Sequence, residues 1–190
     1  MTYKDILKIT ANLVVIYLVG GVILASVYSQ TSPIIYKKAE EEKQNALKNM
    51  MPEADEIYSE KDWLWHPYEK HGEYYEARKD GKVIGYIVRT FGKGYSGYID
   101  MLVSVDKNFV IQKIDILHHT ETPGLGDEIE LDYFKDQFKG KTIDEMKVVK
   151  IESDKYIVAI TGATISTRAV AEDAVKNGIL LLKEKFGKQG

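Results

Sequence analysis

Four hydroxyl side chains fall within seven residues near the C-terminus, in the segment Thr161-Gly162-Ala163-Thr164-Ile165-Ser166-Thr167. The segment lies between a predicted strand over 155–160 and an amphipathic helical pattern. Gly162 permits backbone angles that other residues avoid, and the free N–H groups of a helix start favour a phosphate. The turn is therefore suited to an anion, which a threonine hydroxyl could carry covalently. On the residues alone, the simpler interpretation is that Ser166 or Thr167 caps the helix and the other hydroxyls face water.

A second unusual stretch, His118-His119-Thr120-Glu121-Thr122-Pro123-Gly124-Leu125-Gly126-Asp127, follows a predicted apolar strand. Two histidines near two carboxylates raise the question of a metal site. Adjacent histidines on a strand point to opposite faces, however, which disfavours a shared ion. The proline and glycines predict a shaped loop, either a plain connection or the edge of a binding site.

Composition excludes several classes of function. The chain has 190 residues, a formal net charge of −3 and no cysteine, so disulfides, thiolate nucleophiles and cysteine-ligated clusters are excluded. The negative net charge gives no basic surface of the kind that binds nucleic acid. We find no Ser-His-Asp order, no paired carboxylates with a plausible pocket and no Walker-type loop. No independent acid–base site is predicted.

The elements that must position these residues are mainly strands. The segments 74–78 and 82–91 flank Asp80-Gly81, a strong hairpin signal, and 98–105 with 109–117 form a second predicted hairpin. A short helix is predicted over 127–138. The last segment is amphipathic, with acidic residues early and lysines late, as the helix dipole favours. This order predicts an α+β fold: an antiparallel sheet with packed helices.

The N-terminal part predicts a membrane anchor. From Ile9 to Tyr28 no side chain is charged, and about 20 helical residues span roughly 30 Å of hydrocarbon. A cleaved signal peptide is the alternative. Ser32-Pro33 resembles a helix start and Pro52 a stop, which predicts a stalk helix between them. The predicted division is an anchor at 1–30, a stalk at 31–52 and a globular domain at 53–190. Lysines flank both ends of the span, so charge leaves its orientation open.

The motifs carry a resemblance to a known family. Thr161-Gly162-Ala163-Thr164 resembles the Ser/Thr-Gly-Ala-Thr flavinylation motif of FMN-binding domains in Rnf- and Nqr-type respiratory complexes. The stretch 119–126 resembles the second hallmark of these domains, and Gly94-Tyr95-Ser96-Gly97 a third, weaker one. With one N-terminal span and this length, the whole chain is similar to the G subunits of the Rnf complex. The C subunits of the Nqr sodium-pumping quinone reductase rank second, because they are usually longer.

The resemblance implies that Thr164 bears FMN through a phosphoester, which a magnesium-dependent flavin transferase installs from FAD. By position, the flavin would be bordered by a larger set of residues: Tyr95, Ser96, Glu121, Thr122, Gly124, Leu125, Gly126, Thr161, Gly162, Ala163 and Ile165. The family motif often has an aspartate six residues before the acceptor, where this chain has Val158. That departure bears on the attachment and not on the fold.

The resemblance also implies partners and a location. The chain would be a redox subunit of a translocase that passes electrons between ferredoxin and NAD while moving ions. Its partners would be the other Rnf subunits, the flavin transferase and the lipid bilayer. It would be a single-pass protein of the inner (cytoplasmic) membrane, with the FMN domain on the outer face. The alternative from another class is a cofactor-free docking or assembly subunit.

Overall fold

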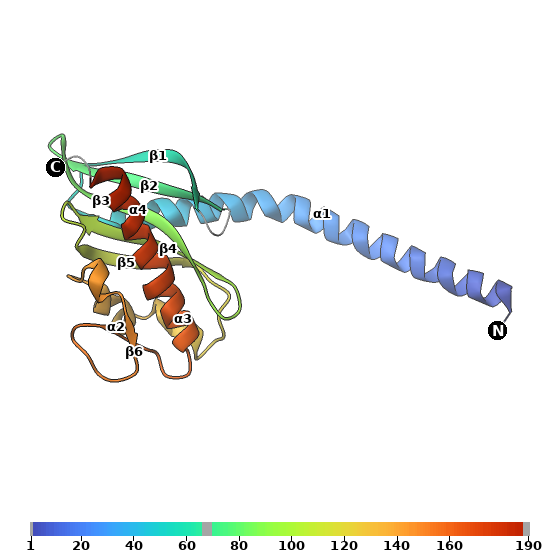
Figure 1. Cartoon of the computed structure of the whole chain (residues 1–190). Helices are drawn as coiled ribbons and strands as arrows, with labels where there is room; N and C mark the ends of the chain where they lie inside the picture. Colours follow the sequence, from blue (N-terminus) through green and yellow to red (C-terminus); the bar gives the residue numbers. More distant parts are fainter. Residues whose placement is uncertain (1, 66–69, 188–190) are drawn as a thin grey trace. The chain divides into compact units, whose positions relative to one another are not determined.

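The structure is a computed structural model that describes residues 2–65 and 70–187. Its main sheet is an antiparallel meander of five strands in chain order: β1 (Glu56–Trp65), β2 (Lys70–Lys79), β3 (Lys82–Lys93), β4 (Tyr98–Asp106) and β5 (Ile111–His118). Helices pack on this sheet (Figure 1). The predicted α+β class is therefore confirmed.

The hairpin between β2 and β3 forms at the predicted turn. Asp80 and Gly81 both have positive φ, +49° and +71°, as the two central residues of a type I′ turn require. Lys79 pairs with Lys82 across it. Strand β1 was not predicted from the sequence, because Glu60-Lys61-Asp62 interrupts its apolar pattern.

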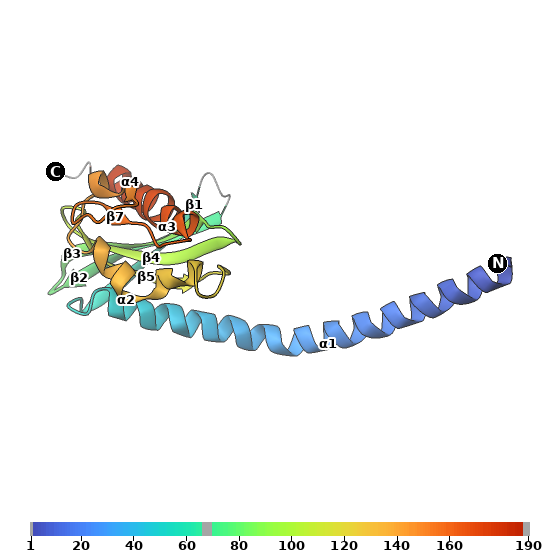
Figure 2. The same cartoon turned by 90° about the horizontal axis from the view of Figure 1, so that it is seen from below.

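The two faces of the sheet are buried in different clusters. Ile87 and Leu102 belong to one cluster, and their neighbours Val88 and Met101 to the other. Successive side chains of a strand point to opposite faces, so the main sheet is covered on both sides. Figure 2 shows it between α4 (Lys176–Phe186) and the last turns of α1 (Tyr3–Met50). Strand β4 is buried along most of its length for this reason.

The remaining elements are short. The predicted helix over 127–138 is three pieces: η1 (Gly126–Glu130), α2 (Asp132–Lys135) and η2 (Asp136–Phe138), followed by η3 (Ile143–Glu145). A second, parallel sheet pairs β6 (Val148–Val149) with β7 (Ile157–Val158). The strand predicted over 155–160 is thus only two residues long. The side chain of Gln137 explains part of this short length. Its Oε1 accepts the Val158 N–H at 2.7 Å, in the place of a backbone carbonyl from a neighbouring strand.

The C-terminal helix is continuous but changes type. It begins as α3 (Thr164–Arg168), passes through the π-helical segment η4 (Ala169–Val175) and ends as α4. Strand β3 holds the π segment, because the Thr90 hydroxyl donates to the Ala174 carbonyl at 2.7 Å. A Cβ at Gly92 would lie only 2.0 Å from the Ala169 carbonyl oxygen, so glycine permits this close approach. These contacts pack the π segment closely against β3.

Helix α1 is a single helix with Pro33 inside it. The helix start predicted at Ser32 is therefore absent, and the predicted anchor and stalk are continuous as one helix. Proline removes one backbone hydrogen bond from a helix, at a cost of about 3 kcal/mol. The helical residues on both sides of Pro33 outweigh this cost, so the helix continues. The predicted end before Pro52 is correct.

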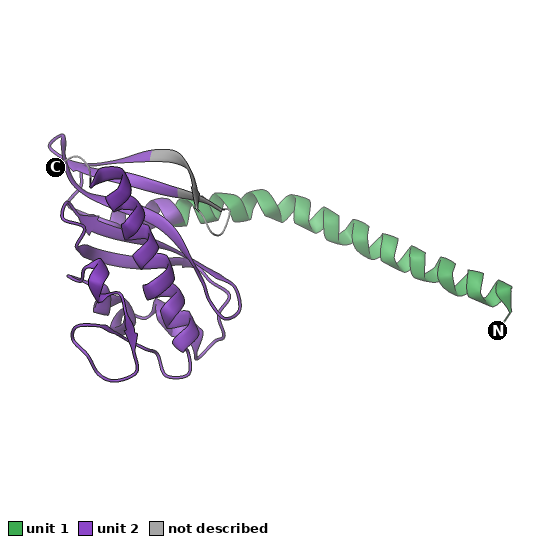
Figure 3. Ribbon diagram, viewed as in Figure 1, with its two compact units in different colours: residues 1–42 green, residues 43–190 purple. Residues whose placement is uncertain are grey.

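The chain divides by its contacts into residues 1–42 and residues 43–190, shown in Figure 3. In the first unit the large apolar side chains are exposed, from Tyr3 to Tyr36. Among the described residues, α1 is the one helix long and apolar enough to cross a membrane. This is consistent with a single membrane anchor.

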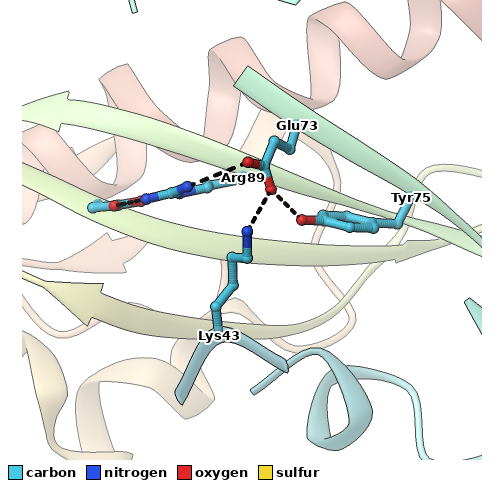
Figure 4. A network of polar contacts seen from close by, with 5 residues as sticks. Lys43, Glu73, Tyr75 and Arg89 are labelled. Carbon is cyan, nitrogen blue, oxygen red and sulfur yellow. Dashed lines mark hydrogen bonds and ion pairs between the residues drawn. The ribbon is translucent and has the colours of Figure 1, made fainter. Parts of the chain in front are cut away.

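The last turns of α1 belong to the second unit. Their apolar residues Ala46, Leu47 and Met50 are buried against the sheet. Lys43 adds a polar contact, because its ammonium donates to Glu73 on β2 at 3.0 Å. Glu73 also pairs with Arg89 at 3.6 Å, as Figure 4 shows. We call this set of charges the Glu73 network.

Candidate functional site

The turn between β7 and α3 contains a backbone conformation with positive φ, which glycine adopts easily. Gly162 adopts φ +80°, and the Ala163 N–H donates to the Ile160 carbonyl at 3.0 Å. The first hydrogen bond of the helix runs from the Thr167 N–H to the Ala163 carbonyl at 3.0 Å. The three preceding N–H groups, from Thr164 onward, therefore lie outside the helical ladder.

The buried hydroxyls of the turn do not cap the helix. The N-terminal cap is Ala163, and it receives no side-chain cap hydrogen bond. The Thr167 hydroxyl donates to the Ala163 carbonyl at 3.0 Å and accepts the Ile160 N–H at 3.1 Å. The Ser166 hydroxyl donates to Glu121. The simpler interpretation from the sequence, a cap by Ser166 or Thr167, is therefore wrong: Glu121 engages the Ser166 hydroxyl, and the backbone of the turn engages that of Thr167.

The other two hydroxyls of the turn differ from these. In the part of the chain that the structure describes, neither Thr161 nor Thr164 makes a side-chain hydrogen bond. Thr164 is half-buried and lines a cleft, whereas Thr161 is exposed and lies outside the cleft lining. Thr164 is thus the one hydroxyl of the four that is both uncommitted and directed to a ligand-sized space.

One carboxylate joins the three sequence motifs. Glu121 is only 5% exposed. It accepts hydrogen bonds from the backbone N–H groups of Tyr95 at 3.1 Å and Ser96 at 2.9 Å, and from the Ser166 hydroxyl. The loop 94–97, the stretch 119–126 and the start of α3 therefore meet at this side chain.

The hydrogen bonds also decide the charge of Glu121. Burial by itself raises the pKa of this carboxyl, but donation from Ser166 and from the N–H groups of Ser96, Tyr95 and Gly97 outweighs burial and holds the pKa below its ordinary value. Glu121 is therefore an anion at neutral pH. Its charge is balanced by neutral donors, and among the described residues it forms no ion pair.

Glycines make this meeting possible. A Cβ at Gly94 would lie 2.5 Å from Glu121 Oε1, and one at Gly126 would lie 2.8 Å from Ser166 Oγ. Both are closer than non-bonded atoms approach. Gly124 has φ +73°, which turns the loop back toward the α3 start. Packing thus requires glycine at positions 94 and 126, and the positive φ favours glycine at position 124.

The two histidines have separate environments. His119 Nδ1 accepts the Glu121 N–H at 3.1 Å, and Nε2 lies 2.8 Å from Glu130. His118 is exposed. Among the described residues, no group of three or more His, Asp or Glu side chains could hold a metal ion. The contacts of His119 instead shape the loop that carries Glu121.

The cleft beside Thr164 has a volume of about 610 Å³. Its lining combines the motifs: Tyr95, Glu121, Thr122, Leu125, Gly126, Lys150, Gly162, Ala163, Thr164, Ile165 and Ser166. Three of these have exposed apolar side chains, namely Tyr95 (73%), Leu125 (44%) and Ile165 (53%). Ligand sites are typically clefts of this size with apolar walls and a few polar groups. The arrangement suits a planar, partly apolar ligand with an anionic end.

Most residues predicted for the site meet in this cleft, with three exceptions. Ser96 contributes its N–H to Glu121, Gly124 forms the loop turn, and Thr161 is exposed; none of them lines the cleft. Sequence reasoning missed Ser166 and Lys150 as lining residues. Ser166 stood in the hydroxyl-rich turn and could have been included. Lys150 gave no signal, because it lies outside every motif.

Val158, which stands where the family motif often has aspartate, lies in β7. Its N–H donates to Gln137 Oε1 at 2.7 Å, and its side chain is half-buried. It is not part of the cleft lining.

Comparisons with known proteins agree with this geometry. The family model of the FMN-binding domain matches residues 94–179. The chain is 37% identical over 173 residues to the G subunit of the proton-translocating ferredoxin:NAD(+) oxidoreductase complex of Clostridium ljungdahlii, covering 89% of this chain and 88% of that protein. The chain belongs to the family of G subunits of ion-translocating oxidoreductase complexes. The predicted resemblance to Rnf G subunits is thereby confirmed.

Two further relatives support the assignment. The G subunit of the ion-translocating oxidoreductase complex of Methanosarcina acetivorans is 30% identical over 174 residues, covering 89% of this chain and 90% of that protein. The crystal structure of the C subunit of the Na(+)-translocating NADH-quinone reductase of Parabacteroides distasonis has a TM-score of 0.58 at 25% identity, covering 80% of this chain and 94% of that one. This chain thus shares its fold with that C subunit, while its sequence matches two G subunits along 89% of its length. The chain is a subunit of a membrane oxidoreductase complex that moves ions.

Proposed function

We propose that this protein bears FMN covalently, as a phosphoester on Thr164, and relays electrons within an ion-translocating ferredoxin:NAD oxidoreductase of the Rnf type. The similarity to G subunits along 89% of the chain supports the complex, and the FMN-binding domain match supports the cofactor.

One observation carries the attachment site. Thr164 has the uncommitted hydroxyl that lines the cleft, whereas Ser166 and Thr167 are bound by Glu121 and by the turn backbone. A phosphorus atom on Thr164 Oγ1 would displace no internal hydrogen bond. On Ser166 it would break the contact that holds the three motifs together.

The residues present fit FMN. The cleft of about 610 Å³ is within the usual range for cofactor sites. The exposed side chains of Tyr95, Leu125 and Ile165 would cover part of the flavin ring, and burial of apolar area stabilises that contact. Thr122, Gly126, Gly162 and Ala163 would form the remaining wall. The N–H groups at the α3 start lie beside the phosphate position.

When bound, FMN supplies the capacity to take up and release electrons. The protein binds the ring, orients it and leaves part of the cleft open to a partner. A covalent bond keeps FMN in place even though such an open cleft holds a free ligand weakly. The carrier therefore does not lose its cofactor between encounters.

We propose that a flavin transferase forms the bond. In this reaction the Thr164 oxygen would attack the FMN phosphorus of FAD, the bond to the bridging oxygen of the pyrophosphate would break, and AMP would leave with that oxygen. The hydroxyl proton goes to a base of the transferase, since no titratable group of this chain is hydrogen-bonded to Thr164 among the described residues.

We further propose that residues 1–30 anchor the chain in the inner (cytoplasmic) membrane as a single span, that 31–52 form the stalk, and that 53–190 form the FMN-binding domain on the outer face. The exposed apolar surface of α1 supports the span. The remaining Rnf subunits and the bilayer are the proposed partners.

Intact mass spectrometry and in-gel flavin fluorescence of the full chain, produced with its transferase, test the attachment. The expected mass exceeds that of the polypeptide by one FMN less one water. Thr164→Val removes the added mass and the fluorescent band, and Thr164→Ser retains both in part because a hydroxyl remains. Lys155→Gln is the control, because Lys155 is exposed and lies outside the motifs and the cleft lining, and it keeps the flavin. A natively produced wild-type chain with only the polypeptide mass would leave cofactor-free docking as the function.

A further inference from the structure

The cleft has two charged lining residues, Glu121 and Lys150, and only one of them is committed. Glu121 is buried and receives hydrogen bonds from the motif loops. Lys150 is exposed and makes no hydrogen bond or ion pair among the described residues. Among the described residues that line the cleft, Lys150 is therefore the charged side chain without a partner.

The parallel pairing of β6 and β7 decides where Lys150 lies. Val149 pairs with Val158, and the Ala159 N–H donates to the Val149 carbonyl at 2.8 Å. Lys150 follows directly, so its backbone lies beside the segment that enters the Thr161–Thr164 turn. Residues of β6 also contact α3. Lys150 thus approaches the cleft from the attachment side.

We propose that Lys150 is a positioning residue that binds the phosphate of the FMN carried by Thr164. This proposal rests on the proposed function. A phosphate joined to both ribityl chain and threonine keeps one negative charge at neutral pH. A lysine ammonium binds phosphate as a compact point charge with three donors, and the covalent bond confines the phosphate to the neighbourhood of Thr164.

The contact has a definite effect on the flavin. A phosphoester on a threonine leaves several rotatable bonds between protein and ring. A second hold on the phosphate removes part of that freedom and keeps the ring against the wall formed by Leu125 and Ile165. Because the pair is exposed to solvent, its contribution is that of a surface ion pair, which corresponds to a change of roughly two- to fivefold between docked and undocked flavin.

Lys150→Gln tests the proposal in the full chain loaded with FMN. Time-resolved fluorescence anisotropy measures the mobility of the attached flavin, and ³¹P NMR reports the environment of its phosphate. The expected result is a fast depolarisation component roughly two- to fivefold larger and a shifted ³¹P resonance. Lys150→Arg restores both, because it keeps the charge. Salt at about 1 M, where the screening length is about 3 Å, reduces the difference between wild type and Lys150→Gln.

Lys155→Gln is the matched control, because Lys155 is exposed, lies 5.4 Å from the centre of the Tyr156 ring and does not line the cleft. It leaves anisotropy and ³¹P shift unchanged. The proposal is overturned if Lys150→Gln is indistinguishable from Lys155→Gln in both measurements. That failure differs from failure of the proposed function, in which the wild-type chain itself carries no flavin.

Discussion

Two shielded carboxylates, Glu73 and Glu121, lie in different parts of the second unit and are stabilised in different ways. Glu73 accepts hydrogen bonds from the Tyr75 hydroxyl and from Lys43 and pairs with Arg89, so two cations and one neutral donor balance its charge. Glu121 is balanced by backbone N–H groups and the Ser166 hydroxyl. In both, the donors outweigh burial and lower the pKa.

The difference shows that one carboxylate stabilises the attachment of α1 to the sheet and the other stabilises the candidate site. The Glu73 network joins the end of α1 to β2 and β3 with ion pairs. Glu121 joins the three motifs of the site with neutral donors and so uses no cation. Lys150, the one cation that lines the cleft among the residues that the structure describes, therefore remains available to a ligand.

The largest effect is expected from Glu121→Ala. The change leaves the N–H groups of the loop 94–97 and the Ser166 hydroxyl without their acceptor, at about 1–3 kcal/mol for each donor that stays buried. We expect a loss of roughly 3 kcal/mol or more in the free energy of unfolding, and loss of flavin attachment. Chemical denaturation measures the free energy of unfolding, and intact mass spectrometry measures flavin attachment. A variant of near wild-type stability that still carries the full FMN mass would contradict the role of Glu121.

Gly94→Ala should have the next largest effect. The added Cβ would lie 2.5 Å from Glu121 Oε1, so the loop or the carboxylate must move, at about 1–3 kcal/mol. The midpoint temperature of thermal unfolding and the intensity of the in-gel flavin band should both decline. Ser96→Ala is the control, since it keeps the N–H that binds Glu121, and it should stay within about 0.5 kcal/mol of wild type. Equal behaviour of the two variants would refute the close packing.

Lys43→Met should destabilise the domain without affecting the flavin. Glu73 loses one cation but keeps Arg89 and Tyr75, and both partners of the pair are partly shielded. We expect a loss of about 1–2 kcal/mol, between the values for exposed and buried pairs. Denaturation of the flavin-loaded chain measures the loss, and in-gel fluorescence should be unchanged. Reduced flavin content would mean that the Glu73 network also shapes the site.

The smallest effect is on the pH dependence of stability. A lowered folded-state pKa gives stabilisation that is present above the unfolded value and is lost as pH falls through the folded value. For Glu73 and Glu121 this window lies below pH 4.5. Glu121→Gln should flatten the acid limb of the unfolding curve. High salt should weaken the contribution of Glu73, which rests partly on ion pairs with Lys43 and Arg89, more than that of Glu121. Equal salt sensitivity of both would remove the distinction drawn between them.

Several elements were predictable because their signals are local. The hairpin at Asp80-Gly81 follows from two residues that tolerate positive φ, and the C-terminal helix from its apolar stripe. The motifs brought Thr164, Glu121 and Tyr95 into one predicted site, and all three line the cleft. Local signals failed where tertiary contacts decide. The sequence predicts a helix start at Ser32-Pro33, although in the structure α1 continues through Pro33 with helical residues on both sides.

The amino-acid sequence by itself determined the apolar span, the alternating strands and the hydroxyl-rich turn, because these depend on residue type and spacing within a few turns or strands. Only the tertiary structure decided which hydroxyl is uncommitted, since Ser166 is engaged by Glu121 from 45 residues away. It also brought Lys150 to the cleft, through the pairing of two short strands. Such contacts depend on the path of the whole chain, which residue spacing does not encode.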